Sequence, residues 1–397
     1  MHKSITRIIL GLLFAYIAAP MCPAAAATQF QSATVPFSFE DNRIFVQCRI
    51  NGQGPYAFVV DTGAGDLTID RALAHRLDLH GKQAGTLGGA GSHTVSYSTA
   101  SIASLAVGTA RASNQQVTIL DLSPIREGIG LRRLDGIIGY SMLRHYAVEV
   151  DMDRHVLTLS RERLALPPDA VSVPFTLDSG FVFVQARIQG QPGRILIDTG
   201  DRSSLTLFGP FAKQHDMYGR FGGVRDVLTG FGIGGPVYGD VFALPQFDIL
   251  GARLTGITTR ASRQSGGAFT SKIAAGSIGG GVLRRFDIVY DYPHSTLRVW
   301  KSADFAVHDG YDRAGLWIST RGDHAYVAGL LPSGPASRAG LRQGDDIVAV
   351  NGRRIDPVDV LTLRAMFATK QPGTTIMVVS QSHDKRSNHA VVLEQLL

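Results

Sequence analysis

The sequence predicts a mainly β protein made of two copies of one unit, followed by an α+β domain that is not repeated. The tripeptide Asp-Thr-Gly occurs twice, at 61–63 and at 198–200, each time directly after a run of apolar β-forming residues. The 397 residues include 45 glycines and only 18% charged residues, a composition that suits many short strands joined by tight turns. The composition changes near residues 302–313, and the residues that follow match neither copy.

The two copies can be aligned over about 140 residues, the scale of a duplicated domain. Residues 35–37 and 173–175 both read Val-Pro-Phe, an offset of 173 − 35 = 138. The offset is 198 − 61 = 137 at the tripeptide aspartates and 291 − 151 = 140 at the aspartates of the last matching segments. We therefore predict a first lobe at 28–165 and a second lobe at 166–305.

Within each copy the elements are expected in the same order. The alternating segments Arg43–Ile50 and Phe181–Ile188 predict strands, and a second, apolar strand then leads to each tripeptide. A short helix follows, at 71–77 with Asp70 as its cap in the first copy and more weakly at 210–215 in the second. Gly-rich hairpins are expected at 85–92 and 230–235, and their tips are free to move. Each copy closes with a strand ending at Gly139 or Gly279, a short helix near Leu143 or Leu283, and a last pair of strands through Asp151 or Asp291.

The third domain is expected at 306–397, after a linker near 302–313. A Pro- and Gly-rich segment at 331–345 leads into a strand at 347–350 and an Asn-Gly turn at 351–352. A helix at about 358–368 and strands at 375–380 and 390–394 complete the expected pattern.

The N-terminus predicts export. Lys3 and Arg7 precede an apolar run at 8–19, and small residues at 24–27 offer a cleavage site, so we predict a signal peptide at 1–27 and a secreted or periplasmic mature chain. An uncleaved anchor is the alternative, but the run is shorter than the ~20 residues that a spanning helix needs. The rest of the sequence predicts no membrane span.

Two further properties exclude classes of function. The formal charge of +6 comes from scattered residues and forms no basic stripe, so we expect no nucleic-acid partner. Cys22 leaves with the signal peptide, which leaves Cys48 alone and excludes an intramolecular disulfide. The counterpart of Cys48 in the second copy is Ala186, so we interpret both as small buried side chains.

On these motifs, residues ~30 to 300 resemble a bilobal aspartic protease built from two retropepsin-like units, and the last ~85 residues resemble a PDZ domain of the bacterial type. The resemblance implies two retropepsin-like β-barrel lobes in an acid-protease fold. In this family each unit supplies one Asp-Thr/Ser-Gly loop and one later strand of two hydrophobic residues and a glycine. Residues 137–139, Ile-Ile-Gly, fit that pattern, whereas Ser277 departs from it at 277–279.

The resemblance implies that Asp61 and Asp198 form the catalytic dyad. Two carboxyl groups about 3 Å apart cannot both ionise, so one acts as a base toward water and the other donates a proton. By the same resemblance Thr62 and Thr199 hold the two loops together, and Gly63 and Gly200 allow the tight turn and donate to the carboxylates.

Asp201 stands where Ser, Thr or Ala is expected. We hypothesise that Asp201 faces the dyad, raises its upper pKa and extends activity toward neutral pH. The alternative is a solvated carboxylate beside Arg202.

The Gly-rich hairpins are expected to be flaps over an extended peptide substrate, or else ordinary surface hairpins. Residues 230–235 also satisfy G-x-G-x-x-G, but no helix follows to receive a pyrophosphate. In the PDZ-like domain the peptide groove is expected beside the strand that holds Trp317, which replaces the usual glycine, although this domain could instead only brace the protease. The candidate flap residues are Gly88, Gly89, Ala90, Gly91, Gly230, Phe231 and Gly232, and the candidate groove residues are Gly315, Leu316, Trp317 and Ile318.

The sequence thus predicts an aspartic endopeptidase that acts on protein or peptide substrates without a cofactor or metal. Because both aspartates lie on one chain, we expect a monomer, with a peptide C-terminus as a possible ligand of the PDZ domain. The chief alternative is a non-catalytic peptide-binding or regulatory protein on the same scaffold. A further one is an oligomeric adaptor organised by the PDZ domain.

Overall fold

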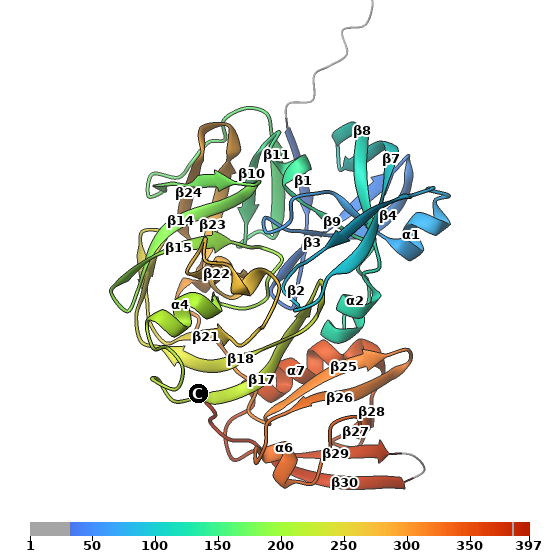
Figure 1. Ribbon diagram of the computed structural model, residues 1–397, viewed down its shortest axis with the longest axis vertical. Helices are drawn as coiled ribbons and strands as arrows, with labels where there is room; N and C mark the ends of the chain where they lie inside the picture. Colours follow the sequence, from blue (N-terminus) through green and yellow to red (C-terminus); the bar gives the residue numbers. More distant parts are fainter. Residues whose placement is uncertain (1–31, 383–384) are drawn as a thin grey trace, which may run out of the picture.

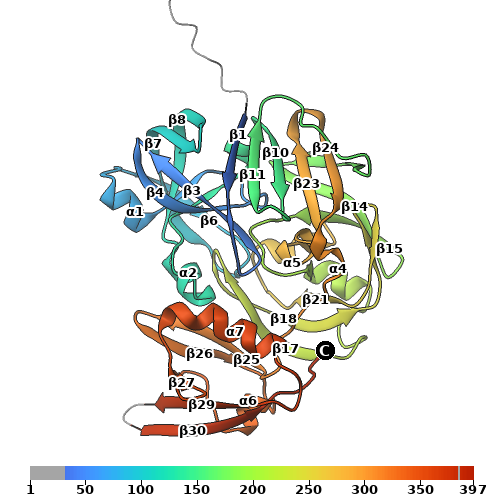
Figure 2. The same ribbon diagram turned by 180° about the vertical axis from the view of Figure 1, so that it is seen from behind.

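The structure is a computed structural model that describes residues 32–382 and 385–397. Two β-rich lobes lie side by side, and a smaller third domain packs below them, as Figures 1 and 2 show from opposite sides. The predicted signal peptide at 1–27 lies outside the described residues. Within those residues, no helix has the length and apolar character to cross a membrane.

The first lobe is an eight-stranded sheet in the order β2-β3-β4-β9-β5-β8-β7-β6, with three short helices. Its pattern follows the sequence: at the end of β3, Gln47 and Arg49 are exposed while Cys48 and Ile50 are buried. Asp70 caps α1 by accepting a hydrogen bond from the backbone N–H of Ala72, as predicted. The elements are β2 (Ser38–Glu40), β3 (Arg43–Ile50), β4 (Gln53–Val60), β5 (Thr68–Asp70), α1 (Arg71–Arg76), β6 (Lys82–Leu87), β7 (Val95–Val107), β8 (Ala110–Leu120), α2 (Ser123–Ile129), β9 (Gly136–Ile138) and α3 (Tyr140–Leu143).

The second lobe follows the same order of elements in a ten-stranded sheet, with an added hairpin of β19 and β20 and with a 3-10 turn at Ala268–Thr270 in place of α2. In both copies the strand that leads to Asp-Thr-Gly pairs in parallel with the short strand before Gly139 or Gly279: β4 with β9, and β15 with β22. The elements are β13 (Thr176–Asp178), β14 (Phe181–Ile188), β15 (Gln191–Ile197), β16 (Leu205–Leu207), α4 (Gly209–Gln214), β17 (Val224–Gly232), β18 (Gly235–Leu244), β19 (Phe247–Ile249), β20 (Ala252–Leu254), β21 (Ile257–Ser262), β22 (Gly276–Ile278) and α5 (Gly280–Leu283).

A third, six-stranded sheet joins the lobes in the order β1-β11-β10-β23-β24-β12. Its central pair, β10 with β23, brings together the last strands of the two copies, with Val148 opposite Tyr290. One hydrophobic core runs through both lobes, so they form a single folding unit. The strands are β1 (Ser32–Pro36), β10 (Ala147–Asp151), β11 (Val156–Ser160), β12 (Val171–Pro174), β23 (Phe286–Asp291) and β24 (Thr296–Lys301).

The third domain has its own hydrophobic core and a sheet in the order β25-β26-β27-β29-β30. The expected helix begins at Val360, after a 3-10 turn at Pro357–Asp359, and the last strand starts earlier than predicted, at Lys385. The elements are β25 (Leu316–Arg321), β26 (His324–Leu330), α6 (Pro335–Arg338), β27 (Asp346–Val350), β28 (Arg353–Arg354), α7 (Val360–Thr369), β29 (Thr375–Ser382) and β30 (Lys385–Val392).

Buried carboxylates anchor the segment 302–313, which the sequence predicts to be a linker. Asp309 accepts hydrogen bonds from Arg285 (2.7 Å) and from the backbone N–H of Thr258 (3.0 Å) in the second lobe. Asp312 accepts from the backbone N–H groups of Ala314 and Leu316 in the third domain. The segment therefore holds the third domain against the second lobe, which its polar composition did not predict.

Candidate active site

Both tripeptides lie at the carboxyl ends of equivalent strands, where the lobes meet. The backbone N–H of Asp61 donates to the carbonyl of Ile138, and that of Asp198 donates to the carbonyl of Ile278, each at 3.0 Å. The short strand before Gly139 or Gly279 therefore anchors the tripeptide loop of its own copy in the same way. Ser277 takes part in this pairing as a buried residue of β22.

The side chains of Thr62 and Thr199 form hydrogen bonds from one lobe to the other. The Thr62 hydroxyl donates to the carbonyl of Ile197 at 2.7 Å and accepts from the backbone N–H of Thr199 at 3.1 Å. The Thr199 hydroxyl does the same in reverse, donating to the carbonyl of Val60 at 2.6 Å and accepting from the N–H of Thr62 at 3.0 Å. Both side chains are buried, so these four bonds fix the distance between the loops.

The two glycines bring each loop against the opposite carboxyl group. The N–H of Gly63 donates to Asp61 at 2.8 Å, and that of Gly200 donates to Asp198 at 3.0 Å. A Cβ atom at Gly63 would lie 2.5 Å from Cγ of Asp198, and one at Gly200 would lie 2.3 Å from Cγ of Asp61. No side chain larger than hydrogen fits at either position.

The carboxyl groups of Asp61 and Asp198 lie close enough for each to affect the ionisation of the other. Burial, the charge of Asp61 and the charge of Asp201 raise the pKa of Asp198 well above its ordinary value. Burial also raises the pKa of Asp61, although the donated bond from Gly63 opposes the increase. The arrangement thus favours one shared proton on the pair. Asp61 and Asp198 are each partly buried residues.

Two parts of the chain match known protein families. Residues 46–142 match the family model described as aspartyl protease, and residues 305–380 match that of the PDZ domain. The first lobe thus carries an aspartyl protease domain, and the C-terminal part of the chain carries a PDZ domain. No curated protein sequence matches the chain significantly.

Two solved structures are among those similar to this chain, both at low identity. Basic 7S globulin from soybean is 11% identical, with a TM-score of 0.41, over 70% of this chain and 98% of that chain. A retropepsin-like aspartic protease from Rickettsia conorii is 17% identical, with a TM-score of 0.26, over 32% of this chain and 91% of that chain.

Asp201 lies beside the protease dyad as a buried ion pair. Its carboxylate is 3.1 Å from Nη2 of Arg260 and accepts hydrogen bonds from the N–H and hydroxyl of Ser203. Burial opposes its ionisation, but Arg260 and Ser203 hold the pKa of Asp201 below its ordinary value, so Asp201 carries a negative charge. The expected alternative of a solvated carboxylate beside Arg202 is wrong, because Arg202 pairs with Asp41 instead. Arg260 is 59 residues from Asp201 in the sequence, and no motif indicated it.

Replacing Asp201 with asparagine is expected to shift the upper limb of the pH–rate profile to lower pH. The Asp201 charge raises the pKa of both dyad residues, and the variant removes that charge while it keeps a side chain of the same shape. Hydrolysis rates measured across the pH range would show the shift. An upper limb that stays in place would contradict this role of Asp201. Asp216→Asn, which changes an exposed carboxylate far along the chain, is the control.

The two Gly-rich hairpins of the protease meet at their tips. The N–H of Gly91 donates to the carbonyl of Ile233 at 2.8 Å, and that of His93 donates to the carbonyl of Gly234 at 3.1 Å. The carbonyl of Gly89 accepts from Ala268 at 2.7 Å. Among the other predicted flap residues, Gly88 is exposed, Ala90 packs against Gly232, and Gly230 and Phe231 lie in β17.

Apolar side chains from both hairpins pack on one core cluster. Tyr97, Phe231 and Ile233 lie against it, as does Ala64, the residue after the first tripeptide. The hydrogen bonds between the tips join the two hairpins in this structure, and we expect the tips to separate when an extended substrate enters.

Replacing Gly91 with alanine is expected to weaken this closure. The added Cβ would lie 2.1 Å from the backbone carbon of Gly234, so the tips must move apart. We expect faster hydrogen exchange at residues 85–94 and a loss of about tenfold or more in kcat/KM, because closure positions the substrate. Gly88→Ala is the matched control, since nothing lies within 4 Å of the added atom. Equal behaviour of the two variants would contradict the closure role.

The predicted PDZ groove residues lie on β25 and the loop before it, but the first lobe covers this strand. The carbonyl of Gly128, at the end of α2, accepts hydrogen bonds from Nε1 of Trp317 (3.0 Å) and from the hydroxyl of Ser319 (2.8 Å). Gly130 packs against Val360 at the start of α7, the other wall of the expected groove. In Figures 1 and 2, α2 lies directly over β25 and α7.

A cavity at the PDZ boundary is lined by neither Asp61 nor Asp198. It has a volume of about 430 Å³ and lies between the two lobes, the segment 304–312 and the PDZ domain. Leu316 and Leu361 line it from the PDZ side, and Arg202 lines it from the protease side.

Within the described residues no three His, Cys, Asp or Glu side chains come together as a metal site requires.

Proposed function

We propose that this chain is an aspartic endopeptidase that hydrolyses peptide bonds in protein substrates with water activated by Asp61 and Asp198. The observation that carries this proposal is the meeting of the two carboxyl groups, each supplied by one lobe and each lying against the glycine of the opposite tripeptide. The raised pKa of Asp198 supports a pair that keeps one proton, as acid–base chemistry on a peptide bond requires.

The proposed reaction uses both states of the pair. The ionised carboxylate removes a proton from water, and the water oxygen bonds to the carbonyl carbon of the peptide. The protonated carboxyl gives its hydrogen to the carbonyl oxygen, which becomes a hydroxyl. When this tetrahedral intermediate collapses, the protonated carboxyl gives its proton to the amine nitrogen and the C–N bond breaks. One hydroxyl of the intermediate returns its proton to an ionised carboxylate as the product carboxyl group forms, so the dyad again holds one proton.

We propose that the hairpin tips close over the substrate and that the PDZ domain recruits or gates protein substrates. The tip contacts between Gly91 and Ile233 support the first part. The contacts of Trp317 and Ser319 with α2 favour gating, because the PDZ domain touches the protease lobe at the expected peptide groove.

Cleavage of a reduced and denatured protein, read by mass spectrometry of new peptide ends, tests the activity. We expect cleavage by the wild type and by Asp66→Asn, which changes an exposed carboxylate five residues from the dyad, and none by Asp61→Asn. Equal cleavage by all three would overturn the proposal. Peptide binding without cleavage by the wild type would favour the non-catalytic alternative.

We also propose that the mature chain is an exported monomer. The support is the charged and apolar pattern of residues 1–27 and the presence of both aspartates on one chain. N-terminal sequencing of the exported protein should give a start near Thr28, and light scattering should give the mass of one chain.

A further inference from the structure

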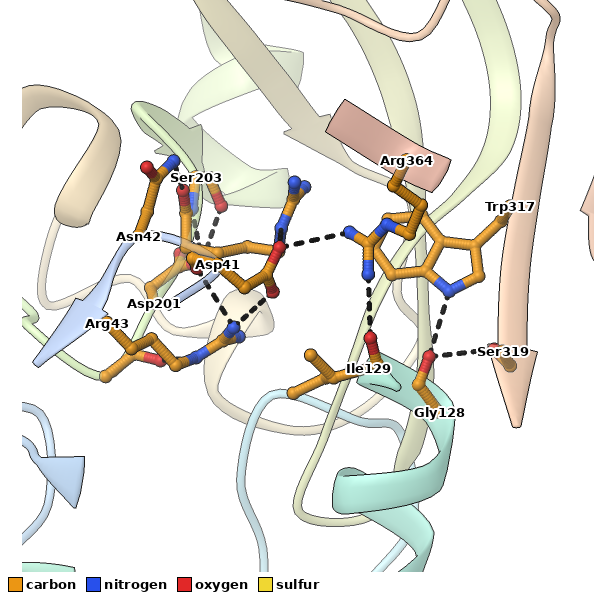
Figure 3. Close-up of polar contacts among 12 residues, drawn as sticks. Asp41, Asn42, Arg43, Gly128, Ile129, Asp201, Ser203, Trp317, Ser319 and Arg364 are labelled. Atoms are coloured by element: carbon orange, nitrogen blue, oxygen red, sulfur yellow. Dashed lines mark hydrogen bonds and ion pairs between the residues drawn. The ribbon is translucent and has the colours of Figure 1, made fainter. Parts of the chain in front are cut away.

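A buried charged cluster connects the PDZ domain to the second catalytic loop. We call Asp41, Arg43, Arg202 and Arg364 the Asp41 cluster. Asp41 and Asn42 form the turn between β2 and β3 of the first lobe, both with positive φ. This turn reaches across to the loop that carries Asp198, and α7 of the PDZ domain approaches it from the other side (Figure 3).

On the protease side, the turn braces the catalytic loop at two carbonyl groups. Nε of Arg43 donates to the carbonyl of Gly200 at 2.7 Å, and the Asn42 amide donates to the carbonyl of Arg202 at 2.8 Å. Arg43 is itself held by Asp41, at 2.5 Å. Gly200 contacts the Asp61 carboxyl and donates to Asp198, so any shift of Arg43 reaches the dyad through one residue.

On the PDZ side, Arg364 forms an ion pair with the same carboxylate, that of Asp41. Its Nη2 lies 3.3 Å from Oδ1 of Asp41, and its Nη1 donates to the carbonyl of Ile129 at 2.9 Å. The guanidinium stacks on the ring of Trp317 at 3.8 Å, and Trp317 in turn donates to Gly128. Arg364 therefore joins the docked PDZ domain, the end of α2 and Asp41.

The charges of this cluster depend on each other. Burial alone would raise the pKa of Asp41, but Arg202, Arg364 and Arg43 hold it well below its ordinary range. Burial and the neighbouring Arg202 and Arg43 lower the pKa of Arg364 to about 9. Three guanidinium groups share one buried carboxylate, so the removal of Arg364 changes how tightly Asp41 holds the other two.

The internal repeat indicates that this cluster is not required by the fold. With the offset of 138 at this turn, Asp41 corresponds to Ser179 and Arg43 to Phe181. The copy makes the same hairpin, with positive φ at Ser179 and Gly180, without either charge. At these two positions, charged residues occur only in the copy whose turn lies between the second catalytic loop and the PDZ domain.

We propose that Arg364 is a positioning residue for the second catalytic loop, acting through Asp41 and Arg43, so that the docked PDZ domain sets the geometry of Asp198. The proposal deepens the proposed protease function and rests on it for its consequence on rate. A ligand that draws the PDZ domain away from α2 would remove Arg364 from Asp41 and loosen the loop at 198–202. The PDZ domain thereby regulates the dyad as well as access to it.

Hydrogen exchange of the full chain tests the link without any assumption about activity. In Arg364→Met we expect the amides of residues 198–204 to exchange about tenfold faster or more, because the turn at 41–43 loses its anchor on α7 and holds the loop less firmly. Arg364→Lys, which keeps the charge, should restore most of the protection. Asp41→Asn should give the same change at 198–204, and the double variant should add little to either. Ser319→Ala weakens the same PDZ contact with α2 but does not touch Asp41, and it should leave 198–204 unchanged.

Kinetics on a denatured protein substrate then test the consequence. For Arg364→Met we expect kcat to fall about tenfold while KM changes by less than about twofold, since a displaced catalytic group lowers the rate more than binding. Faster exchange confined to residues 123–130 and 316–321, with 198–204 unchanged, would overturn the proposal. A wild-type chain that cleaves nothing would instead refute the proposed function, and the exchange comparison would still decide this one.

Discussion

Replacing Asp198 with asparagine is expected to abolish hydrolysis and, at neutral pH, to make the folded chain more stable. The variant cannot share a proton with Asp61, so we expect kcat to fall by about a thousandfold or more, the scale of losing acid–base catalysis. The amide has the same shape, can still accept from Gly200, and can donate to Asp61. It removes a charge that burial and two neighbouring carboxylates disfavour.

The gain in stability should depend on pH in a defined direction. The pKa of Asp198 is raised in the folded state, so its stabilising contribution is complete below the unfolded pKa near 4 and is lost as pH rises toward the folded value. The wild type and Asp198→Asn should therefore melt alike in acid, while the variant gains on the order of 1–3 kcal/mol at neutral pH. Melting temperatures between pH 3 and pH 8, a range spanning the ordinary Asp pKa, measure this. A variant that is inactive but less stable at pH 7 would show that Asp198 is not under electrostatic strain.

Replacing Thr62 with valine is expected to cause a large loss of stability in the protease lobes. Valine has the shape of threonine but lacks the hydroxyl that donates to Ile197 and accepts from Thr199. A buried carbonyl and a buried N–H would then lose their partner, at a cost of about 2–4 kcal/mol in the free energy of unfolding. The loops would also lose their spacing, so activity should fall with stability.

Thr62→Ser is the matched control because it keeps the hydroxyl. Urea unfolding of both variants, followed by tryptophan fluorescence and circular dichroism, gives the comparison. We expect the serine variant to stay within about 1 kcal/mol of the wild type, the size of one lost methyl group. If serine and valine lower stability equally, the cross-lobe bonds do not hold the loops together.

Much of the fold was predicted because each element leaves a local pattern. The mainly β architecture and the C-terminal PDZ domain are confirmed. The cap at Asp70 and the hairpins at 85–92 and 230–235 formed where turn and capping residues indicated them. The segment at 302–313 was predicted to be a linker, and its contacts were not predicted. Asp309 and Asp312 are buried carboxylates with partners in other elements, and composition does not reveal partners.

For the candidate site, too, the sequence predicted some features and only the structure showed the others. The tripeptides marked Asp61 and Asp198, and the structure brings them together, while their catalytic role stays a prediction that Asp61→Asn and Asp198→Asn test. The sequence did not indicate the partner of Asp201. Arg202 is the nearest arginine along the chain, but the fold places Arg260 beside Asp201 instead. Arg43 could have been noticed, since its counterpart in the copy is Phe181, but only the structure shows that it holds Gly200.

By itself, the sequence determined the duplication, the order of strands and the places of the two aspartates. These features follow from side-chain alternation and from turn residues, which act over a few positions. The duplicated unit shows both patterns a second time. Only the tertiary structure decided which charges meet. The contact of Arg364 with Asp41 and of Trp317 with Gly128 joins residues far apart in the chain. Burial makes such pairs strong because little water screens them, and no local pattern along the chain records which residues are buried together.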